Sequence, residues 1–190
     1  VIKMKGHIPS KRALFDIGVA GPIGGLIFAI PITLIGLHFS EVQPIPKDAS
    51  SYLGLGEPIL FSFFTKMMVG EVSEGFDIIL NPIAFAGWAG FFVTALNLMP
   101  IGQLDGGHVI YALLGKRSTI VYRVGIGIFF LFAVFVFKGW ILIAVLLLLF
   151  GFKHPPPADA FTPLDFKRKC IGVIMLVVFI LCFTPIPFKI

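Results

Sequence analysis

Two polar side chains that can do chemistry, Asn97 and Asp105, stand eight residues apart in an otherwise apolar stretch. A carboxylate oxygen is a good ligand for zinc, and a carboxamide can donate a hydrogen bond to a developing oxyanion. Pro100 and Gly102 interrupt the helical pattern between them, so both side chains can turn toward one cavity. In one interpretation, therefore, Asp105 is a metal ligand and Asn97 stabilises an oxyanion.

The same two residues also fit a purely structural interpretation. Asp105 would then cap a short helix over residues 106–114, with Gly106 and Gly107 in its first turn, and Asn97 would cap the end of the preceding helix. The spacing by itself leaves both interpretations open.

Histidine, the most common partner of a carboxylate at zinc, offers no paired motif in this chain. His7, His38, His108 and His154 include no two at a spacing of four. His108 could share a helix face with Asp105, but two ligands make a poor zinc site. We therefore expect His108 to face solvent or lipid headgroups.

The elements that position these residues are predicted to lie in a membrane. Hydrophobic residues make up 57% of the 190 and charged residues only 13%, about half the usual charged share. The net charge of +5 could indicate nucleic acid, but the basic residues cluster at the ends of apolar runs, as residues that set membrane topology do. The composition thus predicts an integral membrane protein in a lipid bilayer and excludes nucleic acid as a partner.

Apolar runs long enough to cross a bilayer predict an all-α polytopic membrane protein with about five transmembrane helices and a short N-terminal edge strand. The spans are predicted at residues 13–37, 78–98, 171–188 and, as two helices joined near Lys138 and Gly139, 120–152. Residues 1–5 alternate with a period of two, which suits the strand. The chain is predicted to form a single domain over residues 1–190.

Charge distribution predicts which side each loop faces. Eleven of the fifteen lysines and arginines fall on one side if the chain starts in the cytoplasm. The N-terminal end and Asp105 are then cytoplasmic, and residues 38–77 form an extracytoplasmic loop. Its apolar part, 53–69, is expected either to dip into the membrane interface or to form an amphipathic helix. Residues 153–170 form a cytoplasmic proline-rich linker.

Within the first span, glycines recur at spacings of three and four, a pattern that permits close helix packing. They are Gly18, Gly21, Gly24 and Gly25. Asp16, four residues after Arg12, is expected to pair with it.

The stretch NLMPIGQLDG, residues 97–106, resembles the N-x-x-P-x-x-x-L-D-G signature of the site-2 protease family of intramembrane zinc metalloproteases, through Asn97, Pro100, Leu104, Asp105 and Gly106. Residues 81–108 resemble particularly the branch of that family found in archaea, cyanobacteria and chloroplasts. The stretch PSKRALFDIGVAGPIGG, residues 9–25, is similar to the family's basic loop and glycine-rich span, with Gly21 and Pro22 in its G-P-x-x-G motif.

The resemblance implies a zinc-dependent endopeptidase that cleaves transmembrane protein substrates, with Asp105 as a zinc ligand and Asn97 stabilising the oxyanion. The opening VIKMK resembles the family's edge strand, which implies that substrate is bound by Val1, Ile2, Lys3, Met4 and Lys5. The H-E-x-x-H motif, which supplies two histidine ligands and the general base in this family, is absent from these residues. We expect it to precede Val1, and we expect the chain to be inactive alone.

Two alternatives stay open. A catalytically inactive relative could still bind membrane helices without H-E-x-x-H. A transporter or channel would also explain a polar break within an apolar span, but it predicts an internal repeat and more intramembrane charge, and the sequence has neither. The oligomeric state is not predicted.

Overall fold

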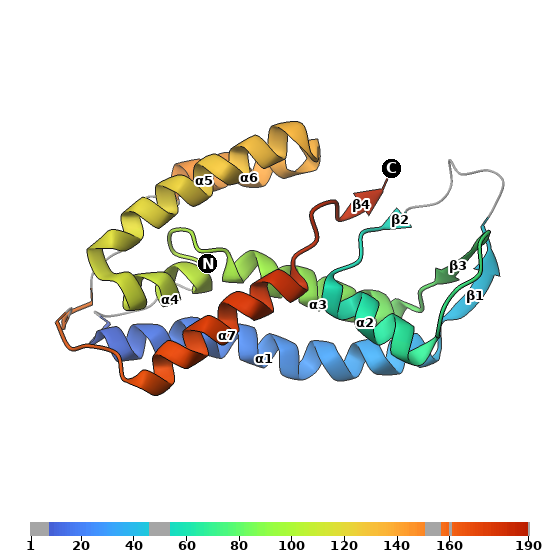
Figure 1. The fold of residues 1–190 in the computed structure, drawn as a ribbon, viewed down its shortest axis with the longest axis horizontal. Helices are drawn as coiled ribbons and strands as arrows, with labels where there is room; N and C mark the ends of the chain where they lie inside the picture. Colours follow the sequence, from blue (N-terminus) through green and yellow to red (C-terminus); the bar gives the residue numbers. More distant parts are fainter. Residues whose placement is uncertain (1–7, 46–53, 151–156, 160, 190) are drawn as a thin grey trace. The chain divides into compact units, whose positions relative to one another are not determined.

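The computed structural model describes residues 8–45, 54–150, 157–159 and 161–189. Most of these residues are helical, as expected (Figure 1). Two compact units result: unit 1 combines Val1–Pro22 with Leu96–Val178, and unit 2 combines Ile23–Ala95 with Phe179–Ile190. The predicted strand over residues 1–5 lies outside the described residues.

Helix α1, Lys11–His38, confirms the helix expected over residues 13–37. It begins where Ser10 Oγ accepts a hydrogen bond from the Ala13 N–H at 3.2 Å, the usual way in which a serine satisfies a free amide at a helix start. By length and composition, α1 is one of two helical runs in the described part of the chain that could cross a membrane.

The second such run is Asp105–Phe135. It consists of α4, Asp105–Leu114, a 3₁₀ turn at Gly115–Arg117, and α5, Ser118–Phe135. The outer face of α5 is apolar, with Ile120, Ile128 and Phe135 between 62% and 80% exposed. Large exposed apolar surfaces of this kind mark contact with lipid or protein, and together with the two long helices they indicate membrane association.

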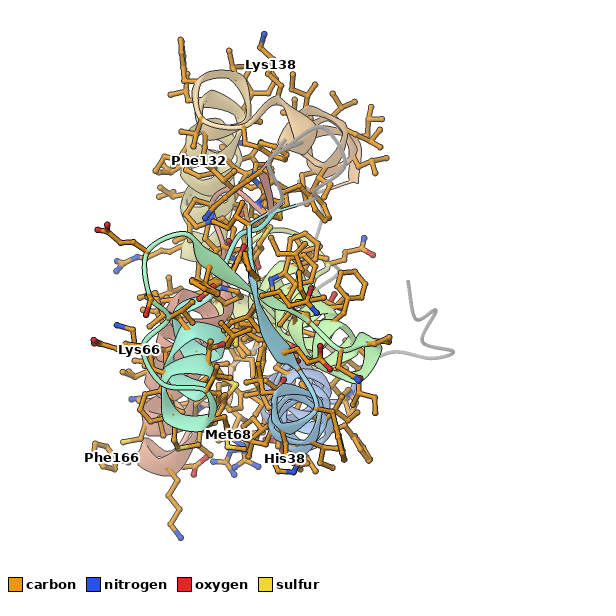
Figure 2. The ribbon with its side chains drawn as sticks, turned by 90° about the vertical axis from the view of Figure 1, so that its right-hand side faces the viewer. His38, Lys66, Met68, Phe132, Lys138 and Phe166 are labelled. Atoms are coloured by element: carbon orange, nitrogen blue, oxygen red, sulfur yellow. The ribbon has the colours of Figure 1, made fainter. Side chains whose placement is uncertain are left out.

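After α5 the chain reverses at Lys138–Trp140, which confirms the predicted turn, and continues as α6, Ile141–Phe150. Figure 2 shows Lys138 at the tip of this turn, directed away from the ribbon. Trp140 is buried and its ring meets Phe129 edge to face at 5.5 Å, which fastens the turn to α5.

The helix expected over residues 78–98 begins later than predicted. Phe76–Ile79 instead form strand β3, which pairs antiparallel with β1, Glu41–Pro44 (Figure 1). Helix α3, Pro82–Leu98, starts at a proline, a residue favoured at the first helical position. Asn81 Oδ1 accepts a hydrogen bond from the second helical residue's N–H at 2.9 Å, so local capping fixes this boundary.

Both ends of the last predicted span were also wrong. Helix α7, Phe166–Cys182, begins within the predicted linker 153–170 and stops well before residue 188. Pro185 and Pro187 follow, and proline cannot continue a helix. The chain then forms β4, Phe188–Lys189.

Strand β4 pairs antiparallel with β2, Gly54–Leu55, in unit 2. The two small sheets, β1–β3 and β2–β4, correct the all-α expectation. Helices α3 and α6 are apolar but short, and α7 has 17 residues, so in the described part of the chain length supports two of the five expected spans.

Helix α2, Ile59–Met68, confirms the helix predicted inside residues 53–69. Its Phe61 and Phe64 are buried against Phe91 of α3, with ring centroids 6.5 and 6.3 Å apart. Trp88 of α3 donates from Nε1 to the Gly56 carbonyl oxygen at 2.7 Å. These contacts form the core of unit 2.

Candidate functional site

The break between α3 and α4 is a compact turn with its own hydrogen bonds. The Ile101 N–H donates to the Met99 carbonyl at 2.7 Å, and the Leu104 N–H donates to the Ile101 carbonyl at 3.3 Å. Gly102 has φ +56°, in the left-handed region that favours glycine. The predicted break is therefore confirmed as an ordered turn within unit 1.

Two glycines let the start of α4 fold back onto this turn. A Cβ added to Gly106 would lie 2.0 Å from the Leu98 carbonyl oxygen, and one added to Gly107 would lie 2.2 Å from the Gly102 carbonyl oxygen. Only a residue without a side chain permits such backbone contact. Because Leu98 follows Asn97 and Gly106 follows Asp105, the turn brings the backbones of the two candidate residues together.

Asp105 is the first residue of α4, and it is not the cap of that helix. The capping position belongs to Leu104, which makes no side-chain cap bond. The half-buried Asp105 carboxylate instead faces α1: a Cβ added to Gly21 would lie 2.6 Å from Asp105 Oδ2. The capping interpretation of Asp105 is thus wrong, and its negative charge still interacts favourably with the helix N-terminus.

Close packing explains only part of the glycine pattern in α1. A Cβ on Gly18 would lie 2.8 Å from the Asp105 carbonyl oxygen and 2.9 Å from His108 Cβ, whereas one on Gly24 would meet nothing within 4 Å. Pro22, beside Gly21, is fully buried. Gly18 and Gly21 therefore form the surface of α1 on which the Asp105 turn rests.

Two other side chains complete the surroundings of Asp105. His108, expected to face solvent or headgroups, is only 8% exposed, because its Cβ packs against α1 at Gly18. Tyr122 of α5 is 1% exposed, and its hydroxyl donates to the Gly107 carbonyl oxygen at 2.8 Å. The sequence analysis did not single out Tyr122. A tyrosine in an apolar run is nevertheless a usable signal, since a buried hydroxyl needs a hydrogen-bond partner.

The remaining predicted residues are placed as follows. Asn97 is exposed in the last turn of α3, whereas Pro100 and Leu104 are half-buried in the break. The predicted strand residues, Val1 to Lys5, lie outside the described residues. The structure therefore brings Asn97 and Asp105 to one turn and leaves the strand prediction untested.

Asp105 alone does not make a zinc site. Among the described residues no cluster of three or more histidine, cysteine, aspartate or glutamate side chains could hold a metal ion. A catalytic zinc takes three protein ligands, of which Asp105 can supply one. The described residues therefore do not fit a complete zinc centre.

Elsewhere in unit 1, an ion-pair cluster fastens α7 to α1. Arg168 donates from Nε to Asp16 Oδ1 at 2.8 Å and from Nη1 to Asp165 Oδ1 at 2.7 Å. The expected Asp16–Arg12 pair is not formed, because Arg12 donates to the Pro163 carbonyl oxygen instead. Hydrogen bonding from Arg168 holds the pKa of Asp165 below its ordinary value.

Comparison with known proteins identifies the family. The model of Peptidase family M50 matches residues 1–137. The chain belongs to peptidase family M50, the site-2 proteases. The resemblance of the N-x-x-P-x-x-x-L-D-G stretch to that family is thereby confirmed.

Curated relatives of this M50 chain come from plants. "Probable zinc metalloprotease EGY2, chloroplastic" of Arabidopsis thaliana is 29% identical over 193 residues, which cover 99% of the chain and 34% of the relative. "Probable zinc metalloprotease EGY3, chloroplastic" of Oryza sativa subsp. japonica is 27% identical over 196 residues, 94% of the chain and 33% of the relative. The M50 chain thus spans about a third of the length of these relatives. No solved structure matches it.

Proposed function

We propose that this M50 chain is part of a zinc-dependent intramembrane endopeptidase that cleaves transmembrane segments of membrane-anchored proteins. Family membership and the relatives' printed description as probable zinc metalloproteases support the class of enzyme. The observation that carries the proposal is the Asp105 carboxylate, which the break after α3 directs at the side-chain-free surface of Gly21.

In this proposal the residues of the turn have separate roles. Asp105 supplies one oxygen ligand to zinc, and the further ligands come from outside the described residues. Asn97, which precedes the break that Asp105 follows, donates to the oxyanion of the substrate carbonyl. Gly21 lies against the Asp105 carboxylate, whereas Gly106 and Gly107 pack on the backbone carbonyls of Leu98 and Gly102 in the break. Tyr122 secures the turn from α5.

The substrate in this proposal is a membrane helix, which hides its peptide bonds in its own hydrogen bonds. It must unwind locally, and an unpaired strand over residues 1–5 would bind the unwound segment by strand addition. The multi-pass topology, with Asp105 toward the cytoplasm, belongs to the same proposal and is supported by the distribution of basic residues.

The test uses the protein that carries this chain in its native membrane, purified and returned to liposomes with a membrane-anchored reporter. Asp105→Ala is expected to lose bound zinc and at least 100-fold of the cleavage rate. Its metal-free form should melt close to the metal-free native protein, the comparison that leaves out stabilisation by zinc itself. Glu74→Ala, which removes an exposed carboxylate from the loop before β3, is the matched control and should change neither. Full cleavage by Asp105→Ala would reject the proposal.

Asn97→Ala separates the two roles. It should retain zinc and lose about 10²–10³-fold in kcat, the usual cost of removing one oxyanion donor. If the unaltered protein binds membrane helices but neither holds zinc nor cleaves them, the chain belongs instead to an inactive helix-binding relative.

A further inference from the structure

In unit 2 the second half of α1 packs antiparallel against α3, and this pair gives a scale of depth for the loop between them. A Cβ added to the glycine at each of four successive levels would lie between 2.0 and 2.9 Å from the facing helix. The levels are Gly36 with Ala84, Thr33 with Gly87, Ala29 with Gly90, and Gly25 with Thr94. Such close contact of small residues is typical of helix pairs in membranes, and it fixes which positions of α1 and α3 lie at the same depth.

The level of Ala29 and Gly90 lies well below the end of α1. Helix α1 has 28 residues, about 42 Å at 1.5 Å per residue, so each end extends about 6 Å beyond a hydrocarbon core of about 30 Å. Ala29 precedes the end of the helix at His38 by nine residues, about 14 Å along the axis. Where α1 spans the bilayer, as the proposed function requires, this level is therefore about 8 Å inside the hydrocarbon.

Helix α2 reaches this depth and runs back outward. Its Phe61 and Phe64 rings pack on Phe91, at the level just described, with centroids 6.5 and 6.3 Å away. The ribbon in Figure 1 and the labelled side chains in Figure 2 place the other end of α2, at Met68, near His38 at the end of α1. The ten residues of α2 measure about 15 Å, which matches the distance between the two levels. The loop after α1 therefore turns into the membrane and returns from it.

The face of α2 that points away from unit 2 is apolar. Ile59, Phe63 and Met67 are four residues apart, so they form one stripe along the helix, and they are 55%, 59% and 55% exposed. The one charged residue within α2, Lys66, is exposed in the last turn, where a lysine stem can extend its ammonium group to the membrane surface. At this depth the stripe meets lipid tails.

The acidic residues of the loop lie away from the stripe. Residues 38–77 carry six acids and two lysines, and Glu57 and Asp77 line a cavity of about 420 Å³ within unit 2. The stem of Lys189 lies against Gly54 in the same lining. A polar cavity of this size has room for water, which the irregular backbone before α2 needs at membrane depth. One side of the loop therefore suits water, and the stripe suits hydrocarbon.

We propose that α2 is a re-entrant helix whose stripe, formed by Ile59, Phe63 and Met67, inserts among the acyl chains of the extracytoplasmic leaflet. The partner is the hydrocarbon of the lipid, because the surplus of acids in the loop disfavours attraction to anionic headgroups. This inference rests on the membrane placement in the proposed function, but it requires neither zinc nor cleavage.

The test measures the depth of single nitroxide labels in the protein that carries this chain, reconstituted in nanodiscs of phosphatidylcholine. Exposed cysteines, Cys170 among them, are replaced by serine, and one cysteine is introduced at a time. Collisions of the label with oxygen, which dissolves in hydrocarbon, are compared with collisions with a water-soluble nickel chelate. Ile27→Cys on α1, at a site that is 61% exposed, is the hydrocarbon reference. Glu74→Cys, in the exposed loop before β3, is the water reference.

Labels on the stripe should behave as lipid-facing and should differ in depth along the helix. Ile59→Cys and Phe63→Cys should resemble the hydrocarbon reference, with strong oxygen and weak nickel collisions. Ile59→Cys should lie up to about 12 Å deeper than Met67→Cys, because eight residues of helix rise by that distance.

Three results would overturn the re-entrant helix while leaving the membrane placement of α1 intact. Water-like values along the whole stripe would place α2 outside the bilayer. Equal depths for Ile59→Cys and Met67→Cys would mean that α2 lies flat in the interface. Weak collisions with both reagents would mean that protein covers the stripe. A water-like Ile27→Cys would instead overturn this proposal together with the membrane placement in the proposed function.

Discussion

Replacing Gly21 by alanine tests whether α1 fixes the position of the Asp105 carboxylate. The added Cβ would lie 2.6 Å from Asp105 Oδ2, and ordinary contact begins at 3.4 Å, so the oxygen must move about 0.8 Å. Oδ2 is the end of a short rotatable side chain, and a rotation of this size costs about 0.5–1.5 kcal/mol. Alanine returns about 0.5–1 kcal/mol through its better helix propensity.

The two effects nearly cancel, so the free energy of unfolding should change by less than about 1 kcal/mol. Catalysis should respond far more, because a displacement of about 1 Å at a catalytic group can cost about 100-fold in rate. We therefore expect Gly21→Ala to lose about 100-fold in cleavage, together with bound zinc, and to melt like the native protein when both are metal-free.

Gly24→Ala is the matched control, since it makes the same change one turn later in the same helix with nothing within 4 Å of the new Cβ. It should gain a little stability and keep full activity. Both variants are compared by thermal melting, by zinc content and by cleavage of the liposome reporter. A Gly21→Ala activity within three-fold of that of Gly24→Ala would refute the idea that α1 positions Asp105.

Three further predictions concern the same unit. Gly106→Ala places its Cβ 2.0 Å from a backbone carbonyl that cannot rotate away, so it should destabilise the protein by about 3 kcal/mol or more, seen as a large drop in melting temperature. Tyr122→Phe leaves the buried Gly107 carbonyl without its 2.8 Å donor and should cost about 1–3 kcal/mol; an unchanged melting temperature would contradict this. Arg168→Gln should lower the melting temperature at pH 7. Hydrogen bonding from Arg168 lowers the folded-state pKa of Asp165 below its ordinary 3.8. The ionised carboxylate therefore stabilises the fold fully above about pH 4, and this contribution is lost as the pH falls through the folded-state pKa. The deficit of the variant should therefore shrink below about pH 4, and a constant deficit across that range would refute the ion-pair explanation.

Features that act through neighbours in the chain could be predicted from the sequence. Pro100 and Gly102 end α3 because proline lacks an amide hydrogen and glycine tolerates φ +56°. The turn near Lys138 followed from a charged residue and a glycine between two apolar runs. The family resemblance of residues 97–106 depends only on residue types at fixed spacings along the chain, and the match to the M50 family confirmed it.

Features that depend on distant partners could not be predicted in this way. Ile78 and Ile79 continue an apolar run into α3, yet they form a strand because β1, more than thirty residues earlier, supplies the hydrogen-bonding edge. His108 is polar enough for a surface, but the glycine at position 18 lets α1 cover it. Asp16 pairs with Arg168 across 152 residues, in preference to Arg12 on its own helix.

The sequence by itself determined that this chain is mostly helical and apolar, and that it carries one carboxylate at a helix break that matches the M50 signature. Only the tertiary structure decided how residues of the same type differ in their contacts. Gly21 faces Asp105 while Gly24 faces open space, and Thr65 lines a cavity while Thr94 bonds its own helix. Spacing along a helix fixes which residues share a face, but the contacts of that face come from elements brought to it by folding.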